Sequence, residues 1–432
     1  MERRYFAERA VGRRRRAVAA AAVETLAMSA NEPDPSVSPN KPIRLCVMTT
    51  IGVSIQFLYG GRLEYLQAHG FDVTVVCASS ELDDAIRARG VRLHTVPFTR
   101  AITVVTDLRA LWDVWRFLRR ERFDLVEVGT PKAALIGTIA ARLARVPCVI
   151  NLVHGLAYEG RAGLAGRIVR LSTALPCRLA HCTIGVSPSV REVAQRDGVC
   201  DSRRMRIIGR GSCNGVDRDR FSPASRRYGP EIRARHDIPA EAVVVGYVGR
   251  MTRDKGLVEL ATAFRTLHQR IPGLILLLVG GYEERDRPPA DVVEFLATCP
   301  AVRHVPWQAD PVPYYGAFDM LVLPSHREGL GVVLLEAAAL GLPAISTDAT
   351  GCRDALVDGE TGIQVPVGDA ERLAAAIERL AMDGELRRRL GVGGRDWVVQ
   401  HFDQERVWRA YAEEYRRLHA ATQRGRVRAG GV

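Results

Sequence analysis

The stretch that decides the fold is Met320-Leu-Val-Leu-Pro-Ser-His-Arg-Glu-Gly-Leu-Gly-Val-Val-Leu-Leu-Glu336. Its first four residues are apolar and predict a buried strand, and Pro-Ser then breaks the pattern. The alanine-rich segment from Val332 to Leu340 predicts a buried helix. A strand that leads directly into a helix is the repeating unit of parallel α/β sheets. Glu328 is therefore expected in the loop at the helix N-terminus, and Glu336 about a turn and a half inside the helix.

The start of this helix is suited to an anion. The backbone N–H groups of Gly329, Leu330 and Gly331 have no acceptor within the helix, and the glycines let an anion approach them closely. Carboxylates on either side of an anion site suit a sugar nucleotide, whose hydroxyls meet the carboxylates while its diphosphate meets the amides. The plainer alternative is a solvated Glu328, with Glu336 paired to a nearby arginine.

A second group of residues follows an earlier strand. The apolar run Val243–Val248 ends in Gly249-Arg250-Met-Thr-Arg-Asp-Lys255-Gly256, and a helix is expected from Leu257 to about Arg270. Arg250 and Lys255 thus follow the carboxyl end of a strand, where open parallel sheets bind ligands. A guanidinium fork and an ammonium point charge together neutralise a diphosphate. The alternative is an ordinary surface loop in a basic chain.

Composition narrows the range of functions. A chain of 432 residues can form two domains of ordinary size, and 25% charged with 47% hydrophobic residues is typical of a soluble globular protein. The net charge of +12 favours anionic partners, namely nucleotide diphosphates, anionic lipid surfaces or nucleic acid. Nucleic acid is the least favoured, because aromatic residues are few and the arginines are scattered.

The cysteines and the N-terminal segment indicate a cytoplasmic protein. The chain has 9 cysteines, an odd number with no Cys-x-x-Cys pair, which predicts neither disulfides nor a zinc site. Cys213 is the exception among them, since it falls in a candidate site loop. Arg13 to Arg16 and the following alanines imitate a secretory signal, but Glu24 interrupts the apolar stretch. Residues 1–41 are predicted to be a disordered extension, and no run approaches the length of a membrane span.

From Ile43 onward, apolar strands alternate with helical segments, which predicts an α/β fold of two doubly wound Rossmann-like domains facing a cleft. The first domain is expected over residues 42–222 and the second over residues 240–402. Between them, Phe221–His236 is interpreted as a linker. A final amphipathic helix over residues 403–424 could pack back on the first domain. The second half predicts six strands, each followed by a helix, at Val243, Leu274, Val302, Met320, Pro343 and Gly362.

In the first half, one helix is expected from near Phe57 to His69, and another begins at Asp107 as its N-cap and ends at about Arg122. The apolar stripe of the latter is predicted to be Leu108, Leu111, Trp115 and Leu118. Strand Cys148–Val153 ends in His154, and a basic, apolar helical stretch follows over Arg161–Leu179.

These residues resemble a known family. The chain is similar to the retaining family 4 glycosyltransferases of the two-Rossmann (GT-B) architecture, and the resemblance covers Ile43 to about Leu418. It rests on Gly249-Arg250…Lys255-Gly256, the Glu328…Glu336 run, Gly280-Gly281, and Asp348…Gly351 with Asp358-Gly-x-x-Gly362. A narrower similarity, to enzymes that extend undecaprenyl-diphosphate-linked glycans of bacterial polysaccharides, rests on Thr130–Ala134, Val153–Leu156 and Gly209–Asp217.

The resemblance implies roles for individual residues. Arg250 and Lys255 would bind the diphosphate of a nucleotide sugar. Gly329, Leu330 and Gly331 would supply backbone amides to the same diphosphate. Glu328 would contact the transferred sugar and Glu336 the ribose. The base, expected to be that of uridine, would lie near Gly280 and the Val305–Gln308 turn. The resemblance assigns catalysis to Glu328, His154, Arg250 and Lys255. It assigns donor binding to Gly249, Arg250, Lys255, Gly280, Gln308, Glu328, Gly329, Leu330, Gly331 and Glu336. The acceptor side of the cleft is assigned to Gly52, Lys132 and Asn214.

Alternatives stay open for two of these residues, and the chain departs from the family pattern at one place. His154 matches a histidine that faces the transferred sugar, but it could be a buried histidine satisfied by the backbone. Asn214, followed by Gly215, could form an ordinary turn. Relatives often place histidines just before Thr-Pro-Lys, where this chain has Glu127-Val128-Gly129. If those histidines meet the acceptor, the acceptor preference here would differ.

The mechanism implied by the resemblance needs no cofactor, no metal and no protein nucleophile. Asp217-Arg-Asp219 matches a metal-binding Asp-x-Asp formally, but it follows an Asn-Gly-Val turn and lies among arginines. A hydrolysing sugar-nucleotide epimerase shares the architecture and is the alternative activity. A nicotinamide oxidoreductase is disfavoured, since no Gly-x-Gly-x-x-Gly follows the first strand.

The acceptor class suggests contact with the inner leaflet of the cell membrane. Arg109, Arg116, Arg119, Arg120 and Arg122 accompany Trp112 and Trp115, and a second basic group comprises Arg161, Arg167, Arg170 and Arg178. Basic amphipathic helices can rest on an anionic leaflet. A solvated arginine face is the alternative for each helix separately.

Overall fold

The computed structural model describes residues 41–99, 103–161 and 163–425, which form two compact units. The N-terminal unit contains the described residues up to Gly185, together with Ala194–Arg206 and the described residues from Trp408 onward. The C-terminal unit contains Val186–Val193 and Ile207–Val407. The expected N-terminal extension lies outside the described residues, apart from Lys41.

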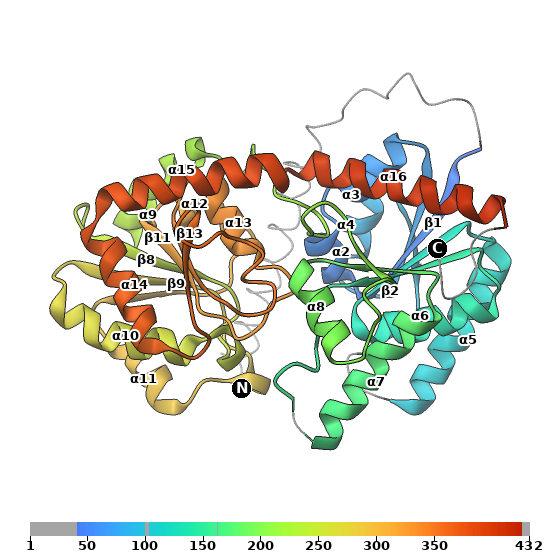
Figure 1. Cartoon of the computed structure of the whole chain (residues 1–432), viewed down its shortest axis with the longest axis horizontal. Helices are drawn as coiled ribbons and strands as arrows, with labels where there is room; N and C mark the ends of the chain where they lie inside the picture. Colours follow the sequence, from blue (N-terminus) through green and yellow to red (C-terminus); the bar gives the residue numbers. More distant parts are fainter. Residues whose placement is uncertain (1–40, 100–102, 162, 426–432) are drawn as a thin grey trace, which may run out of the picture. The chain divides into compact units, whose positions relative to one another are not determined.

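A seven-stranded sheet forms the centre of the N-terminal unit, in the order β3-β2-β1-β4-β5-β6-β7 (Figure 1). The strand pairs from β3 to β6 are parallel. The chain order reverses between β1 and β4, so the switch point of the sheet lies there. The strands are β1 (Ile43–Ile51), β2 (Phe71–Ala78), β3 (Arg92–Thr95), β4 (Leu125–Gly129), β5 (Cys148–Val153), β6 (Cys182–Gly185) and β7 (Met205–Ile207).

Helices flank this sheet. The helices of the N-terminal part are α2 (Gly52–Leu58), α3 (Arg62–Ala68), α4 (Asp83–Ala88), α5 (Val104–Glu121), α6 (Pro131–Leu143), α7 (Gly163–Leu179) and α8 (Pro188–Arg196). Helices α5 and α6 pack on β1, β2, β4 and β5 through a core that includes Met48, Val114, Phe117, Val128 and Ile136. Helix α6 also packs against α7.

The last helix, α16 (Gln404–Gln423), joins the N-terminal unit from Trp408 onward. Its Tyr411 ring lies 4.3 Å from the guanidinium carbon of Arg62, which is fully buried. Arg62 also forms an ion pair of 2.8 Å with the equally buried Glu127 on β4, and the Tyr415 hydroxyl donates to that carboxylate. Glu127 therefore holds α16 and α3 to the sheet. Glu127 is fully buried, and it is one of the three residues that stand where family members often have histidines.

The C-terminal unit is built on a six-stranded parallel sheet in the order β10-β9-β8-β11-β12-β13, and its switch point lies between β8 and β11. Strands such as Leu-Ile-Leu-Leu-Leu-Val in β9 are buried on both faces, as parallel strands covered by helices must be. The strands are β8 (Val243–Val248), β9 (Leu274–Val279), β10 (Val302–Val305), β11 (Met320–Leu323), β12 (Ala344–Thr347) and β13 (Gly362–Val365).

The helices of this unit surround the sheet (Figure 1). The α-helices are α9 (Gly229–Arg235), α10 (Leu257–Arg270), α11 (Ala290–Thr298), α12 (Val312–Tyr315), α13 (Val332–Ala339), α14 (Ala370–Met382) and α15 (Gly384–His401). Short 3-10 turns are η1 (Pro223–Tyr228), η2 (Arg253–Lys255) and η3 (Glu284–Asp286). The α/β class, the two Rossmann-like sheets and all six strands predicted for the second half are confirmed.

Four predictions about the positions of helices are wrong. The single helix near Phe57–His69 is two helices, α2 and α3, because Gly61 takes a left-handed φ of 75° between them. The supposed linker Phe221–His236 is mostly helical, as η1 and α9. No helix follows β12, whose chain continues through turns to β13. Helix α5 begins at Val104 rather than at Asp107.

The described cysteines are all buried and free of disulfides. Within residues 41–99, 103–161 and 163–425, no helix combines the length and the apolar character that crossing a bilayer would require.

Candidate active site

The loops that follow β8 and β11 meet at the switch point of the C-terminal sheet. Gly256 makes this possible, because a β-carbon at this position would lie 1.9 Å from the carbonyl oxygen of Pro324. Its φ of 70° is also in the left-handed region that favours glycine. The loop that carries Lys255 is therefore pressed directly against the loop that carries Glu328.

Lys255 and Glu328 form a short ion pair in this position. The ammonium nitrogen of Lys255 lies 2.5 Å from Oε1 of Glu328, and the side chains are only 13% and 18% exposed. The Ser325 hydroxyl donates to the same carboxylate oxygen across 3.0 Å. One oxygen of Glu328 is thus fixed by two donors. Because Glu328 has a bound partner and little exposure, the alternative of a solvated glutamate is wrong.

Arg250 lies at the same end of the sheet but remains about half exposed. Its Nη1 lies 2.7 Å from Oε2 of Glu283, and the Tyr247 hydroxyl donates to its carbonyl oxygen across 2.6 Å. Burial would lower the pKa of Arg250, but the carboxylate of Glu283 and, more weakly, those of Asp254 and Glu328 raise it overall. Arg250 is therefore within electrostatic reach of Glu328, and a shared donor site for the two residues stays a prediction.

The start of α13 offers fewer unpaired amides than expected. The helix begins at Val332 with Gly331 as its N-cap, and the Gly331 N–H donates to the carbonyl oxygen of Gly351 across 3.3 Å. Among the described residues, no acceptor is found for the amides of Gly329 and Leu330. The predicted anion site at this helix start therefore has two amides available. Gly331 has no side chain and so leaves room for an anion to approach them.

Glu336 lies within α13 beside an aromatic hydroxyl. Tyr315 donates its hydroxyl proton to Oε2 of Glu336 across 2.6 Å. Burial raises the pKa of Glu336 to about 7, although the Tyr315 hydrogen bond and the charge of Arg220 oppose the shift. This carboxyl group can consequently exchange a proton near neutral pH. Its direct partner is a tyrosine rather than the arginine that the plainer interpretation proposed.

The loops that follow β8 and β9 come into close backbone contact. A β-carbon on Gly280 would lie 1.8 Å from the Gly249 carbonyl oxygen, so both glycines bring their chains together. The Gly280 N–H donates to the carbonyl oxygen of Val305 across 2.9 Å. Gln308 turns its amide nitrogen to the Pro306 carbonyl at 3.0 Å, while the neighbouring Trp307 is 58% exposed. An exposed aromatic ring here is a surface on which a flat base could stack.

His154 follows β5 in the N-terminal unit. Among the described residues, neither of its buried ring nitrogens has a hydrogen-bond partner, so the alternative of a histidine satisfied by the backbone is wrong. Burial and, second, the charge of Arg62 lower its pKa to about 3, which keeps the imidazole neutral. The Tyr59 ring meets the imidazole edge-on, with 6.1 Å between ring centroids. Such a group can exchange hydrogen bonds with a ligand hydroxyl without adding charge.

The three residues assigned to the acceptor side occupy different settings. Gly52 is the first residue of α2, directly after β1. Lys132, near the start of α6, forms an ion pair of 2.7 Å with Asp107 and is only 13% exposed, so its charge is already engaged within the unit. Asn214 lies in the C-terminal unit, where its N–H donates to the Ser212 hydroxyl across 3.2 Å in a tight turn.

Sequence reasoning missed four residues that contact the predicted ones, namely Glu283, Ser325, Tyr315 and Tyr59. The first two could have been found, because each follows the carboxyl end of a strand beside the switch point. The two tyrosines reach Glu336 and His154 through tertiary packing, for which no local pattern exists.

Asp217 and Asp219 form a turn. Asp217 Oδ1 accepts the N–H groups of Asp219 and Arg220 at 3.1 and 3.0 Å. In the described part of the chain, no three His, Cys, Asp or Glu side chains gather in a way that could hold a metal ion.

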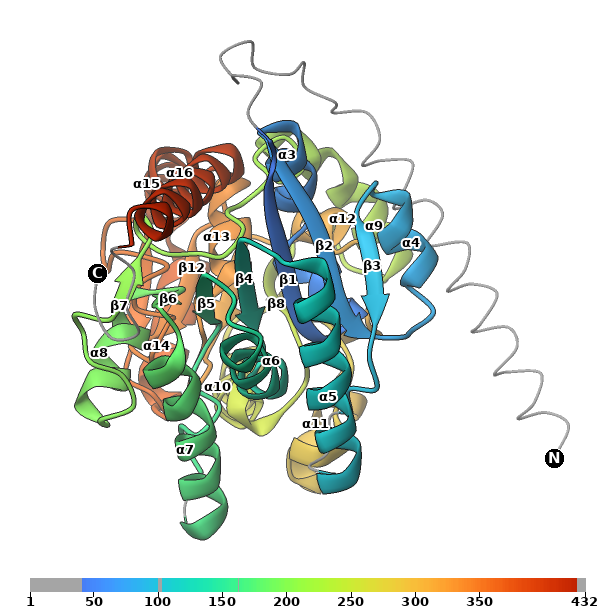
Figure 2. The same ribbon diagram turned by 90° about the vertical axis from the view of Figure 1, so that its right-hand side faces the viewer.

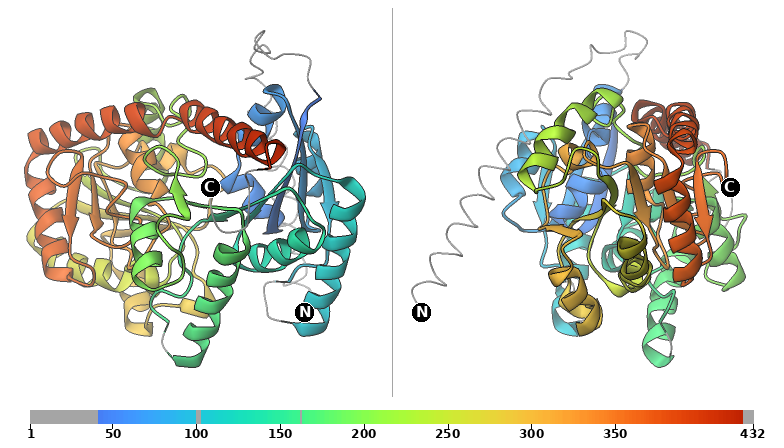
Figure 3. Two further views of the ribbon diagram at one scale, coloured as in Figure 1. Left: turned by 45° about the vertical axis from the view of Figure 1, so that its right-hand side comes forward. Right: turned by 90° about the vertical axis from the view of Figure 1, so that its left-hand side faces the viewer.

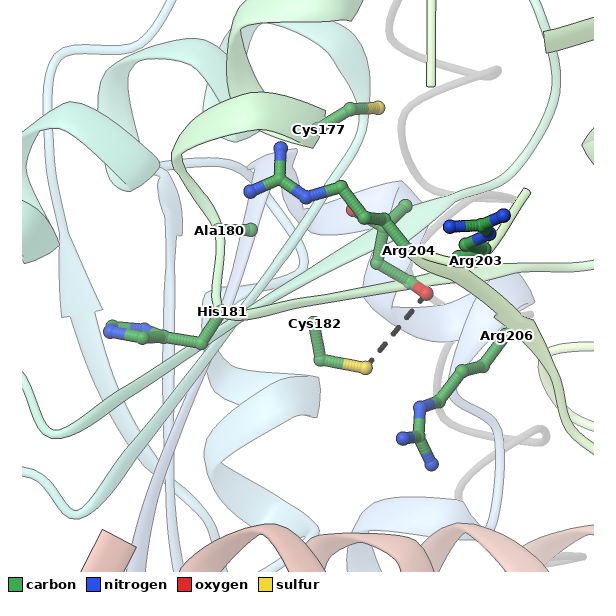
Figure 4. A pocket seen from close by; sticks show the side chains of 8 residues that line it. Cys177, Ala180, His181, Cys182, Arg203, Arg204 and Arg206 are labelled. Atoms are coloured by element: carbon green, nitrogen blue, oxygen red, sulfur yellow. Dashed lines mark hydrogen bonds between the residues drawn. The ribbon is translucent and has the colours of Figure 1, made fainter. Parts of the chain in front are cut away.

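A separate small cavity lies between α7 and β6 in the N-terminal unit (Figure 4). Its volume of about 20 Å³ holds roughly one water molecule. Arg203, Arg204 and Arg206 line it but point in different directions, and Arg206 instead contacts Glu414 at 3.4 Å. This cavity is too small for a substrate.

Two family models match the chain. One, described as glycosyl transferases group 1, matches residues 229–397, and the other, a glycosyl transferase 4-like domain, matches residues 62–211. The capsular polysaccharide biosynthesis glycosyltransferase CapM of Staphylococcus aureus is 31% identical over 368 residues, which cover 85% of this chain and 95% of that protein. A UDP-Gal:alpha-D-GlcNAc-diphosphoundecaprenol alpha-1,3-galactosyltransferase of Escherichia coli is 28% identical and covers 75% of this chain and 84% of that protein.

Solved structures agree on the fold. Sucrose-phosphate synthase from Thermosynechococcus elongatus has a TM-score of 0.73 at 24% identity, covering 88% of this chain and 100% of that one. Anabaena Alr3699/HepE, in complex with UDP and glucose, has a TM-score of 0.71 at 20% identity, with coverages of 86% and 99%.

Proposed function

The chain belongs to the group 1 glycosyltransferases with the GT-B fold, and on that premise we propose a retaining transfer of a sugar from a nucleoside-diphosphate sugar to a polyprenyl-diphosphate-linked glycan. The observation that carries the donor part is the Lys255–Glu328 ion pair at the switch point, with Arg250 beside it. A pair of cations next to a fixed carboxylate can bind a diphosphate and a sugar hydroxyl at once.

The charges of this site suit departure of a nucleoside diphosphate. When the anomeric C–O bond breaks, its electrons leave with the diphosphate and positive charge develops on the sugar. Arg250, Lys255 and the backbone amides of Gly329 and Leu330 stabilise the leaving diphosphate, and such preorganised groups supply a large part of catalysis. The Glu328 carboxylate orients the sugar and favours its cationic transition state.

The rest of the proposal follows from the same charge balance. The acceptor hydroxyl attacks from the face of the leaving group, and a diphosphate oxygen takes its proton, so the reaction uses neither a protein nucleophile nor a metal. The neutral imidazole of His154 binds a hydroxyl of the transferred sugar. Glu336 binds the ribose, and Trp307 with Gly280 receives the base. Gly249 and Gln308 complete the donor site.

Relatives suggest the substrates. The Escherichia coli relative uses UDP-galactose and a diphosphoundecaprenol-linked sugar, as its name states, and the Staphylococcus aureus relative serves capsular polysaccharide biosynthesis. We therefore propose a UDP-sugar donor, a hexose or an N-acetylhexosamine, and transfer at the inner face of the cell membrane for cell-surface polysaccharide. Gly52, Lys132 and Asn214 are proposed to serve the acceptor, Lys132 by holding α5 to α6 through Asp107.

A donor screen tests the function. The full chain is incubated with UDP-sugars and a polyprenyl-diphosphate-sugar acceptor, and the product is identified by mass and by the anomeric configuration in NMR spectra. We expect transfer with retention that persists in a chelator. Inversion at the anomeric carbon contradicts the retaining mechanism. Isomerisation of the donor without an acceptor indicates a sugar-nucleotide epimerase instead.

Site variants test the residues. Glu328→Ala should lower turnover by about 100-fold or more, and Arg250→Ala should weaken both UDP binding and turnover, because each removes a preorganised charge. Glu371→Ala, which removes an exposed carboxylate on α14, is the matched control and should behave as the wild type. Near-normal rates in either site variant would contradict the assignment.

A further inference from the structure

Helix α7 packs in an unusual orientation, with its small residues inward and its large apolar residues outward. Its buried residues include Gly166, Ala174 and Cys177. The exposed fractions of its large apolar side chains are 74% for Leu164, 48% for Ile168, 65% for Leu171 and 39% for Leu175. Their spacing of four, three and four residues places all of them on one face of the helix. This apolar stripe faces away from the core rather than toward it.

Helix α5 shows a similar stripe over its N-terminal half. Val104, Val105, Leu108 and Trp112 are exposed by 70%, 82%, 62% and 58%. The sequence predicted Leu108 in the buried stripe, and this is wrong. The buried residues of α5 are instead Ala110, Val114, Phe117 and Leu118. Large apolar side chains are seldom exposed in such continuous groups on a monomer surface without a partner.

The two helices that carry the stripes lie on the same face of the N-terminal sheet. Both helices pack against α6, one on each side. Helix α5 follows β3 and helix α7 follows β5 along the chain. Both helices therefore begin near the carboxyl edge of the sheet, which also carries His154. Figure 2 and the left panel of Figure 3 show α5 and α7 on either side of α6, with both helices reaching beyond the sheet.

The charges between and beside the stripes are strongly basic. Helix α7 contains no acidic residue, and its exposed arginines include Arg167, Arg170 and Arg178, preceded by Arg161. Helix α5 exposes Arg109, Arg116, Arg119 and Arg120, while its three acidic residues, Asp107, Asp113 and Glu121, are partly buried. A second copy of this chain on the same surface would bring arginines against arginines. An anionic lipid leaflet instead complements both the charge and the apolar stripes.

We propose that the exposed faces of α5 and α7, here called the docking surface, bind an anionic membrane leaflet with the apolar side chains among the acyl chains and the arginines at the lipid phosphates. The role of this docking surface in the reaction rests on the proposed function. It would bring the carboxyl edge of the N-terminal sheet to a lipid-linked acceptor in the same leaflet. Trp112 marks the depth of insertion, since tryptophan favours the boundary between headgroups and acyl chains.

Vesicle binding tests the docking surface without knowledge of either substrate. The full chain is sedimented with phosphatidylcholine vesicles that contain phosphatidylglycerol, in the wild type and in the variant Leu108→Gln, Trp112→Gln, Leu164→Gln, Leu171→Gln. Glutamine keeps the helices, because it is a good helix former. Each buried side chain contributes about a tenfold step in partitioning. We therefore expect the variant to lose vesicle binding while the wild type binds.

Two further variants make the result specific. Met382→Gln with Val392→Gln removes exposed apolar side chains of the C-terminal unit, which are 74% and 55% exposed, and should bind vesicles as the wild type does. Arg116→Gln with Arg167→Gln should weaken binding to anionic vesicles and reduce its dependence on salt, because each arginine meets a lipid phosphate. Vesicles of phosphatidylcholine alone should bind the wild type less.

The outcomes separate this inference from the proposed function. UDP binding, measured by calorimetry, should be the same in the wild type and the docking variant. If UDP fails to bind the wild type, the donor proposal is wrong, while vesicle binding still decides the docking surface. The docking surface is overturned if the wild type ignores anionic vesicles or if the docking variant binds them as well as the wild type. A dimer lost in that variant without any change in vesicle binding would assign the surface to a second copy instead.

Discussion

Burial raises the pKa of Glu336 from 4.5 to about 7. Between these values the folded protein keeps a proton that the unfolded chain has released, so the free energy of unfolding falls as the pH rises through this window, by roughly 3 kcal/mol at most. Glu336→Gln removes the charge. We expect the variant to be more stable than the wild type at pH 8 and similar near pH 4, in urea denaturation, and to bind UDP more weakly. A variant that is less stable at pH 8 would contradict this reasoning.

Oε2 of Glu283 lies 2.7 Å from Nη1 of Arg250, and the two residues form an ion pair. The side chain of Arg250 is 51% exposed and that of Glu283 is 44% exposed. A diphosphate that binds Arg250 must displace this carboxylate. Exposed pairs are worth up to about 1 kcal/mol, so Glu283→Gln should raise UDP affinity by up to about fivefold in titration calorimetry. Glu284→Gln is the matched control, because its carboxylate pairs with Arg287 instead. Equal or weaker UDP binding by the Glu283 variant would show that this carboxylate does not compete.

At the level of elements, the sequence predicted the strands better than the faces of the helices. Buried parallel strands such as β9 are continuous apolar runs, and turn residues bound them on both sides, so their positions are readable. The stripe of α5 was partly misread, since Leu108 is apolar and correctly spaced but faces outward. Periodicity shows that a helix has an apolar face, whereas the neighbours that cover it are decided by the fold.

The same limit applies to the candidate site. Arg250, Lys255 and Glu328 were predicted from their position after strands, because the carboxyl ends of parallel strands share one edge. The acceptor for the Gly331 amide was not predictable, because Gly351 lies in a turn beyond the next strand. The contact of Glu127 with Arg62 and Tyr415 was also beyond the sequence, since it joins three elements that are distant along the chain.

The turn from β4 into α6 carries a prediction of its own. A β-carbon on Gly129 would lie 2.8 Å from Nε2 of His154 and 2.9 Å from the Tyr59 hydroxyl oxygen. Gly129→Ala should therefore push these side chains apart and cost about 1–3 kcal/mol of stability, measured by denaturation. Gly384→Ala is the control, because its β-carbon would meet only the flexible end of Arg387 at 3.4 Å. An unchanged stability of the Gly129 variant would mean that His154 and Tyr59 move freely.

For the whole molecule, the two units allow stability and ligand binding to be tested separately. The Arg62–Glu127–Tyr415 contacts lie entirely within the N-terminal unit, whereas Lys255 and Glu328 lie entirely within the C-terminal unit. Tyr415→Phe removes a hydrogen bond to a buried carboxylate, which should cost about 1.5–3 kcal/mol. UDP should stabilise only the unit that binds it.

Scanning calorimetry of the full chain should therefore resolve two transitions that respond to different changes. Tyr415→Phe should lower the Tm of one transition, and saturating UDP should raise the Tm of the other, with neither change affecting both. Arg206→Gln serves as a control within the N-terminal unit, because its ion pair with Glu414 is partly exposed and contributes little. A single transition that shifts with both changes would mean that the units unfold together, and α16, which begins in one unit and continues into the other, would be the element that couples them.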